Sequence, residues 1–194
     1  VYLQRWNGIS GGAITNLTQA VHYKDAADVT EVRTSLDAPD IPVDNYGQKL
    51  SAILVPTETN DYQFAVAGDY ATELKLSMDA FAVNAKTITQ KTSWTNYQDW
   101  NAAGKSNTIR LEAGKAYYIE LLHKADGGTD HASVAWKRSS DTTYSLLPVT
   151  LLYQDAMSAG VVKPAFLAHG NNFLIKGTTA VGTKVTQVAA LDPQ

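Results

Sequence analysis

Three large aromatic residues, Trp94, Tyr97 and Trp100, lie within one short polar stretch of the chain. Exposed Trp and Tyr side chains stack on the faces of sugar rings because they combine a flat apolar body with a polar edge. The alternative is that these rings cover one end of the fold, since most large aromatic side chains are largely buried. Residue type and spacing leave two interpretations open here, a sugar-binding platform and part of the hydrophobic core.

A second polar stretch, residues 125–131, contains Gly127, Gly128, Asp130 and His131. Glycine tolerates positive φ, and a loop of this composition leaves backbone amides and carbonyls free to meet a ligand. A loop aspartate such as Asp130 also commonly caps a turn through its own backbone, so a structural role is the competing interpretation. The four histidines show no His-x-x-x-His spacing for a metal, and we expect His131 to orient this loop.

The sequence lacks the local motifs of common catalytic sites. It has no Gly-x-Ser-x-Gly nucleophile turn, no phosphate-binding loop and no His-Glu-x-x-His motif. Its 19 acidic residues could supply a carboxylate pair for glycoside cleavage, but nothing in their spacing localises one. With no cysteine, disulfides, thiol nucleophiles and Cys-ligated metals are excluded. We therefore expect a binding or structural protein rather than an enzyme.

The elements that would position these loops read as short β-strands. Residues 117–122 and 132–136 flank the second loop and alternate with a period of two, which is typical of strands with one buried face. Further strands are predicted at 1–6, 50–55, 62–66, 74–78, 108–111 and 151–153, and residues 16–22 fit either a short helical turn or an irregular strap. Trp6 and Trp136 are expected in the core. Many short strands separated by turn signals predict an all-β fold, an antiparallel β-sandwich or barrel.

Charge and hydropathy set limits on the partners. A formal net charge of −3 gives no reason to expect nucleic acid or an anionic membrane as a partner. No stretch approaches the roughly 18 apolar residues of a membrane-spanning helix, so we expect no membrane span. The sequence begins without Met or a signal peptide, and we expect it to be a mature or excised segment.

Several separated motifs closely resemble, in the same order, those of the PA14 domain family. They are RWNGISG at 5–11, SLDAP at 35–39, DNYG at 44–47, PTETNDYQF at 56–64, Trp-Thr with Asp-Trp between 94 and 100, and Gly-Gly-x-Asp-His at 127–131. The resemblance covers roughly the first three-quarters of the chain, which makes it far more specific than one short motif. It implies that residues 56–64 form a hairpin and that the strand at 151–153 returns beside the N-terminal strand.

PA14 domains are secreted β-domains of adhesins, glycosidases, yeast flocculins and bacterial toxins, and where they accompany enzymes they are appended binding modules. The resemblance therefore implies an extracellular, cell-surface or secreted location and a glycan-binding or adhesion module of a larger protein. Glycans or another surface protein would be the partners. The ligand-binding residues would be Asp69, Tyr70, Trp94, Tyr97, Trp100, Asp130 and His131. The alternative is a structural module of an extracellular filament or surface array, which associates by strand addition without binding sugar.

The resemblance also implies a calcium site with one ligand altered. In carbohydrate-binding PA14 domains, two adjacent loop aspartates hold a calcium ion that also ligates sugar hydroxyls. Here the first position is Asp69 and the second is Tyr70, while Asp130 matches the second calcium-proximal loop and Gly127 and Gly128 would supply carbonyls. Calcium takes six to eight hard oxygen ligands, so the loss of one carboxylate removes both charge and ligands. We expect Ca²⁺ to bind weakly or not at all.

The composition changes after Trp136, and the chain divides into three predicted parts. These are a PA14-like β-domain at 1–155, a linker at 156–170 and a short, incomplete β segment at 171–194. The last part resembles the opening of a bacterial cadherin-like repeat, with GTKV leading to ALDP. Such a domain needs about seven strands, and only the first two could be present. Either this segment packs back on the first domain, or a neighbouring copy or a continuation of the chain completes it by strand addition. We expect completion by another chain, which would allow a homo-oligomer through these C-terminal strands.

Overall fold

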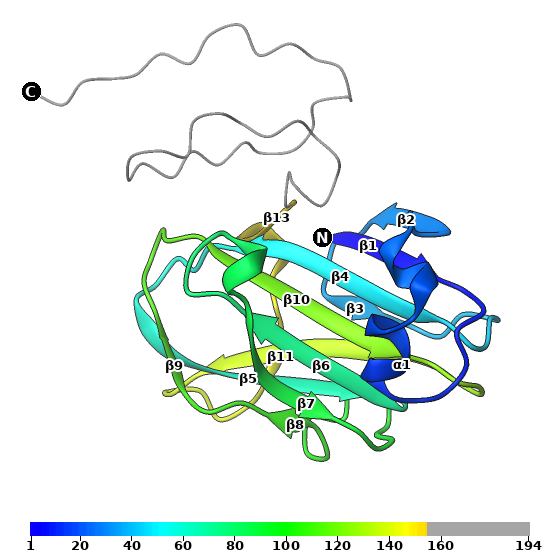
Figure 1. Ribbon diagram of the computed structural model, residues 1–194. Coiled ribbons are helices and arrows are strands. Elements are labelled where there is room, and N and C mark those ends of the chain that lie inside the picture. Colours follow the sequence, from blue (N-terminus) through cyan, green and yellow to red (C-terminus); the bar gives the residue numbers. More distant parts are fainter. Residues whose placement is uncertain (155–194) are drawn as a thin grey trace, which may run out of the picture.

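Two antiparallel sheets face each other across one core in the computed structural model, which describes residues 1–154 (Figure 1). Within these residues, the first sheet runs β2-β1-β4-β10-β6-β7, with β13 also paired to β4. Its strands are β1 (Tyr2–Trp6), β2 (Val29–Val32), β4 (Gly47–Leu54), β6 (Ala71–Leu76), β7 (Lys86–Lys91), β10 (Tyr117–Lys124) and β13 (Leu152–Tyr153). The all-β antiparallel sandwich predicted from the sequence is confirmed.

The second sheet runs β12-β11-β5-β8, with β3 paired to β11 and β9 paired to β5. Its strands are β3 (Asp37–Ala38), β5 (Asn60–Gly68), β8 (Gly104–Lys105), β9 (Ile109–Leu111), β11 (Ala132–Arg138) and β12 (Ser145–Leu146). Helical structure within 1–154 is confined to α1 (Ile14–Thr18) and the 3₁₀ turns η1 (Val21–Lys24), η2 (Ala82–Asn84) and η3 (Val149–Leu151). The ambiguous stretch 16–22 is thus helical rather than an irregular strap, and no helix of the described chain is long and apolar enough to cross a membrane.

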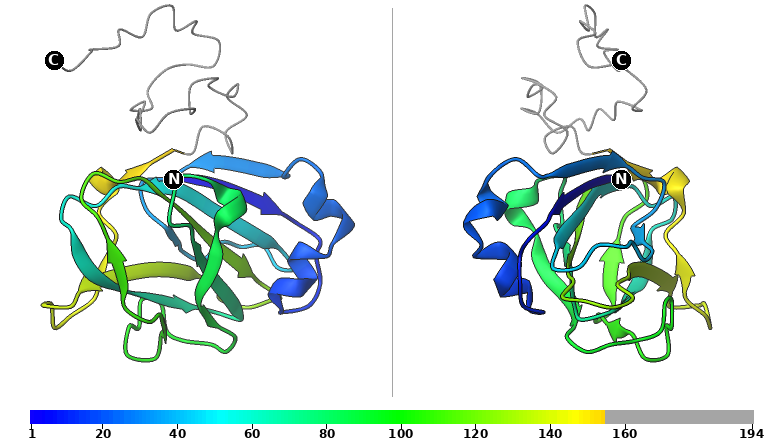
Figure 2. Two further views of the ribbon diagram at one scale, coloured as in Figure 1. Left: turned by 60° about the vertical axis from the view of Figure 1, so that its left-hand side comes forward. Right: turned by 90° about the vertical axis from the view of Figure 1, so that its right-hand side faces the viewer.

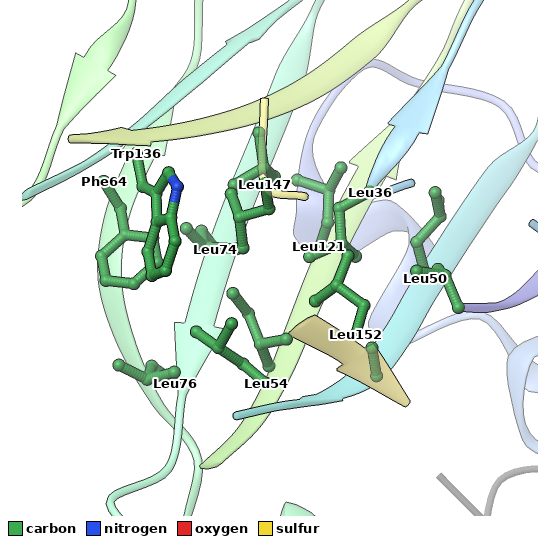
Figure 3. Packing of buried hydrophobic residues seen from close by; sticks show 14 of the residues in the cluster. Leu36, Leu50, Leu54, Phe64, Leu74, Leu76, Leu121, Trp136, Leu147 and Leu152 are labelled. Carbon is green, nitrogen blue, oxygen red and sulfur yellow. The ribbon is translucent and has the colours of Figure 1, made fainter. Parts of the chain in front are cut away.

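The core lies between the sheets and is filled by alternate residues of the facing strands (Figure 3). Phe64 and Trp136 come from the second sheet, and Leu74 and Leu121 come from the first. The Trp136 ring stacks on Tyr62 with centroids 4.5 Å apart. Such aromatic pairs add roughly 0.5–1.5 kcal/mol beyond the burial of their surface. The period-two pattern predicted these strands because every second side chain of a strand points to the same face.

Two predictions about pairing and burial are wrong. Residues 56–64 do not form a hairpin, because β4 belongs to the first sheet and β5 to the second. β10 does not have one buried face only, because Tyr118 and Leu122 on its outer side are as buried as Leu121 on its inner side. α1 covers part of this outer face by packing against β10 and β6, and Ala80, Ala85 and Tyr153 pack against the cluster that contains Tyr118.

The last described strand returns to the first sheet. β13 pairs with Leu54 and Ile53 of β4, just beyond the residues of β4 that pair with β1. The strand predicted at 151–153 therefore lies next to β4 rather than directly beside the N-terminal strand. The N-terminus and the end of the described chain lie at the same side of the molecule in both views of Figure 2. The predicted linker at 156–170 and cadherin-like segment at 171–194 lie outside the described residues.

Truncating Leu74 to alanine tests this core. Leu74 is fully buried between the sheets, and Leu→Ala changes at such positions cost about 2–5 kcal/mol because they leave a cavity. We expect urea denaturation to show a loss of that size, whereas Val32→Ala, at a position 71% exposed, should cost less than ~1 kcal/mol. Equal losses for the two variants would contradict the packing described above.

Candidate functional site

The end of β5 is fixed to the loop at 125–131 through the backbone of Asp69. The Asp69 N–H donates to the His131 carbonyl at 2.9 Å, and the Asp69 carbonyl accepts from Nε2 of His123 at 2.9 Å. Both backbone groups of this buried residue are therefore satisfied by the segment 123–131. The two aspartates expected from the sequence, Asp69 and Asp130, are brought to the same end of the sandwich in this way.

His123 is a site residue that the sequence analysis did not identify. It is fully buried, and its Nδ1 accepts a hydrogen bond from Nε2 of Gln48 at 2.9 Å. Because the Asp69 carbonyl can only accept, the ring proton must be on Nε2. Burial lowers the pKa of His123 to about 4, so the ring is neutral near pH 7. The alternation along β10 was the one signal in the sequence that could have identified His123, because a residue two positions after inward-facing Leu121 points to the same face.

Tyr70 occupies the position next to Asp69 in an unusual backbone conformation. Its φ is +55°, in the left-handed region. Among the described non-glycine residues, Asn45 and Gln98 also have a positive φ. The Tyr70 N–H donates to Oδ1 of Asp69 at 2.8 Å. The ring packs on the N-terminal loop, since a Cβ added at Gly12 would lie 2.6 Å from the ring. The phenol side chain thus joins the first loop of the chain to the candidate site.

The aromatic stretch is tied to the same end of β5. The Thr95 N–H donates to the Gly68 carbonyl at 3.0 Å, and the Gly68 N–H donates to Oγ1 of Thr95 at 2.9 Å. Thr95 is buried, but its neighbour Trp94 is 58% exposed. Thr95 is buried and hydrogen-bonded to Gly68, whereas the residues on either side of it are exposed. The backbone next to Trp94 is therefore fixed while the Trp94 ring lies in solvent.

Tyr97 links the aromatic stretch to the loop at 125–131. Its ring meets the His131 ring edge-on, with centroids 5.6 Å apart and planes at 89°. Its hydroxyl donates to Oδ2 of Asp37 at 2.6 Å, while the ring remains partly open at 46% exposure for the residue. Trp100 is half-buried, and within residues 1–154 no hydrogen bond or ring contact joins it to the other candidate residues. The structure therefore groups Trp94 and Tyr97 with the aspartates but does not group Trp100 with them.

Asp130 is a buried carboxylate without a partner. It is fully buried, and neither of its carboxylate oxygens has a hydrogen-bond partner within residues 1–154. Its N–H donates to Oδ1 of Asp40 at 3.0 Å. Burial, followed by the charges of Asp69, Asp44 and Asp40, raises the pKa of Asp130 to about 6. Asp40 and Asp44 were not predicted as site residues, although DNYG at 44–47 is one of the motifs that carry the family resemblance.

One buried ammonium partly offsets these negative charges. The Nζ of Lys124 donates to the Ala125 carbonyl, and the Lys124 charge counteracts the rise in the Asp130 pKa. Burial in turn lowers the pKa of Lys124, against the opposing charges of Asp126 and Asp130. Asp126 also accepts the Gly11 N–H at 2.8 Å. The segment 124–130 therefore carries both signs of charge, with the carboxylates in excess.

The donor chemistry of this end of the sandwich fits a calcium ion, whereas the number of ligands is low. Asp130 offers two unpartnered carboxylate oxygens, and calcium prefers such hard oxygen donors. Asp69 would be the second carboxylate, although its Oδ1 already accepts the Tyr70 N–H. Within residues 1–154, no three Asp, Glu or His side chains form a group that could hold a metal ion. An ion here would depend on two carboxylates, loop carbonyls such as those of Gly127 and Gly128, and water.

Comparisons with known proteins identify the class of this domain. Residues 19–148 match the PA14 domain. Solved structures with the same fold include the PA14 sugar-binding domain of an RTX adhesin, with a TM-score of 0.59, 11% identity, and coverage of 78% of this chain and 96% of that one. The PA14 domain of MpAFP antifreeze protein has a TM-score of 0.59 and 13% identity, and the match covers 78% of this chain and 88% of that one. The Epa6A adhesin domain of Candida glabrata, in complex with Galβ1-3GlcNAc, has a TM-score of 0.56 and 11% identity, and the match covers 78% of this chain and 84% of that one.

The chain belongs to the PA14 domain family. It is also 33% identical over 138 residues to mouse N-acetyl-beta-glucosaminyl-glycoprotein 4-beta-N-acetylgalactosaminyltransferase 1. That match covers 66% of this chain but only 13% of the mouse protein, so the chain spans about an eighth of the length of this relative. The likeness to the solved structures, at identities of 11–13%, concerns the fold alone.

The buried Asp130 carboxylate predicts a specific pH dependence of stability. A folded-state pKa of about 6, above the ordinary 3.8, means that ionisation of Asp130 opposes folding. Its contribution is favourable below about pH 4 and is lost as the pH rises through about 6, amounting to at most ~3 kcal/mol. We expect Asp130→Asn to be more stable than the wild type at pH 8 in the presence of a chelator, and similar to it at pH 4.

The comparison of these two proteins isolates Asp130 from His123. The lowered pKa of His123 has the opposite effect, since its contribution is lost as the pH falls from about 6.5 to 4, but it is present in both proteins. Glu112→Gln, at a carboxylate whose side chain is 63% exposed, is the control and should retain the wild-type profile. Urea denaturation at several pH values measures the difference, and an Asp130→Asn variant that is less stable than the wild type at pH 8 would contradict the prediction.

Proposed function

We propose that this chain is a glycan-binding module of a larger extracellular protein. The observation that carries the proposal is the exposed Trp94 and Tyr97 pair on a loop anchored beside Asp69 and Asp130. Ligand sites in proteins combine apolar or aromatic surface with a few placed polar groups, and this end of the sandwich offers both. The adhesin domains with this fold, among them Epa6A with Galβ1-3GlcNAc and the RTX adhesin sugar-binding domain, support this role.

The proposed division of labour follows from the chemistry of the side chains. Trp94 would stack on one face of a sugar ring, because its indole is the more exposed of the two rings. Tyr97 would contact the same ligand with its ring edge while its hydroxyl remains on Asp37. The carboxylate of Asp69 would accept hydrogen bonds from sugar hydroxyls, since ionised carboxylates act only as acceptors. Asp130 is fully buried and would act behind it, by holding a cation rather than by touching the sugar. His131 would position this loop through its contact with Tyr97.

We also propose a weak calcium site at Asp69 and Asp130, with carbonyls of Gly127 and Gly128 as further ligands. A bound ion would supply positive charge for these carboxylates and coordination positions for sugar hydroxyls. Tyr70 supplies no carboxylate at the adjoining position, so the site has fewer negative oxygens than a pair of aspartates would give. The protein's own contribution is to hold Asp69 by two backbone hydrogen bonds and to keep Asp130 out of water.

The proposed role includes no catalysis. The curated mouse relative is a transferase, but the chain covers only 13% of its length, and we assign this chain to a binding module of such larger proteins. The second candidate is an assembly module of an extracellular array that binds no sugar. The exposed apolar side chains of Met78 and Val83, which lie outside the candidate site, favour some protein contact.

A glycan-array measurement tests the sugar-binding role. We expect Trp94→Ala to abolish the signal of the wild-type chain while the melting temperature changes by only a few degrees, because this ring is largely exposed. Tyr97→Phe should retain most of the signal, since it keeps the ring and removes only the hydroxyl bonded to Asp37. Trp100→Ala is the comparison at a half-buried ring. Unchanged binding in Trp94→Ala would exclude the platform.

Calcium titration tests the proposed ion. We expect a dissociation constant for calcium above about 1 µM, as weak as that of the weaker calcium sensors or weaker still. Asp69→Ala should raise this dissociation constant further. Tyr70→Asp should bind calcium more tightly than the wild type, because it adds a carboxylate at a left-handed position that Asp tolerates. Tyr70→Asn is the matched control without the charge. Sub-micromolar binding by the wild type that disappears in Asp69→Ala would show that the site is strong and would contradict this account.

A further inference from the structure

One edge of the first sheet is open at β2, the terminal strand beside β1 (Figure 1). The Val1 ammonium donates to the Arg33 carbonyl at 3.1 Å, and the Arg33 N–H donates to the Val1 carbonyl at 2.8 Å. Hydrogen-bonded and non-hydrogen-bonded pairs alternate along an antiparallel ladder, so Thr30 and Val32 are non-hydrogen-bonded partners of β1. Their N–H and C=O groups point away from β1, and within residues 1–154 no hydrogen bond joins these groups to another segment.

The side chains along this edge carry one charge of each sign on the same face. Glu31 lies opposite the core residue Leu3 of β1, so Glu31 and Arg33 belong to the inner face of the sheet and Val32 to the outer face. Nη2 of Arg33 lies 2.9 Å from Oε2 of Glu31, while Nε of Arg33 has no hydrogen-bond partner within residues 1–154. Val32, between the two charges, is 71% exposed. The guanidinium therefore retains donors for a second carboxylate.

The charges distinguish the registers in which two copies of β2 could pair about a two-fold axis. The outward-pointing groups of Thr30 and Val32 allow registers centred on Thr30, Glu31 or Val32. Centring on Thr30 places Glu31 opposite Val29 and forms no charge pair, whereas centring on Glu31 places two like charges opposite each other, which is destabilising. Centring on Val32 places Glu31 opposite the second copy's Arg33, which is stabilising. In that register the edge is complementary to itself, with the sequence Thr30-Glu31-Val32-Arg33-Thr34.

We propose that β2 is a docking edge for a second copy of this chain, with the two β2 strands antiparallel and Glu31 of each copy paired with Arg33 of the other. The two Val32 residues would exchange a pair of backbone hydrogen bonds and so use the groups that point away from β1. The first sheets of the two copies would then form one continuous sheet across the dimer. This contact is separate from the glycan-binding site and does not rest on the glycan-binding role.

The charges on β2 and the small size of the contact determine how strong the pairing can be. A charge on a short edge strand commonly prevents edge pairing, but here two opposite charges flank Val32 symmetrically, so they oppose one register and favour another. Small interfaces are transient, and we expect a dissociation constant on the order of 0.1–1 mM. Copies held close together on one surface would reach such concentrations. The dimer would then present two copies of the domain to a ligand at once.

Sedimentation equilibrium of the full 194-residue chain at concentrations from about 20 µM to about 1 mM tests the pairing. We expect the average mass of the wild type to rise from that of the monomer towards that of the dimer across this range. Glu31→Arg and Arg33→Glu should each remain monomeric, because each variant places like charges opposite each other in the dimer. An equimolar mixture of the two variants should associate at least as strongly as the wild type, since every charge pair between the copies is then opposite.

Arg110→Glu, at a side chain 61% exposed on β9, makes the same charge change away from β2 and is the matched control. It should associate as the wild type does, and melting temperatures verify that each variant is folded. A wild type that stays monomeric at the highest concentration would overturn the proposal. Association of Arg33→Glu equal to that of the wild type would overturn it by placing the interface elsewhere in the chain. Single variants that remain monomeric when mixed would also overturn it, because the charge pairing between copies would then be wrong.

Discussion

The candidate site depends on the way the chain crosses between the sheets after β10. β10 pairs on both sides with β4 and β6, and the chain then passes through residues 125–131 to β11, which pairs with β5 in the other sheet. Because both strands are held by long ladders, the crossing segment is fixed at each end. The Asp69 N–H to His131 bond then joins the end of β5 to this crossing. The polar residues at this end of the sandwich are positioned by these constraints.

The same crossing places charge where burial makes it costly. A buried carboxylate without hydrogen-bond partners opposes folding, and Asp130 has neither solvent nor a partner within the described chain. Lys124 compensates only in part, since the pKa of Asp130 remains raised to about 6. The neutral His123 ring, in contrast, forms two hydrogen bonds and fixes the Asp69 backbone without adding charge. The ionised Asp130 carboxylate thus lowers the stability of the fold, and a bound cation would reduce that cost. The backbone around it is fixed by the hydrogen bonds to Asp69.

Local patterns predicted the elements better than their pairing. The alternation at 117–122 and 132–136 identified β10 and β11, and the resemblance to PA14 domains singled out Asp69, Asp130 and the aromatic loop. The hairpin at 56–64, which the family resemblance implied, is wrong because a turn between two consecutive strands does not decide whether they pair, and β4 and β5 belong to different sheets. Asp40 and His123 were not predicted as site residues. Asp40 contacts Asp130 across 90 residues of sequence, and a single His within an apolar strand carries no motif.

The ligand-binding face that we propose is the end of the sandwich formed by the Trp94–Tyr97 loop and residues 125–131. An amide-resolved NMR titration of the isotope-labelled chain with Galβ1-3GlcNAc and Galβ1-4GlcNAc, the disaccharides seen with the Epa6A and Epa9A adhesins, tests it most directly. We predict that chemical-shift changes concentrate on the amides of Asp69, Trp94, Tyr97 and His131 and on the Trp94 indole N–H. Changes confined to other faces of the two sheets would contradict the account.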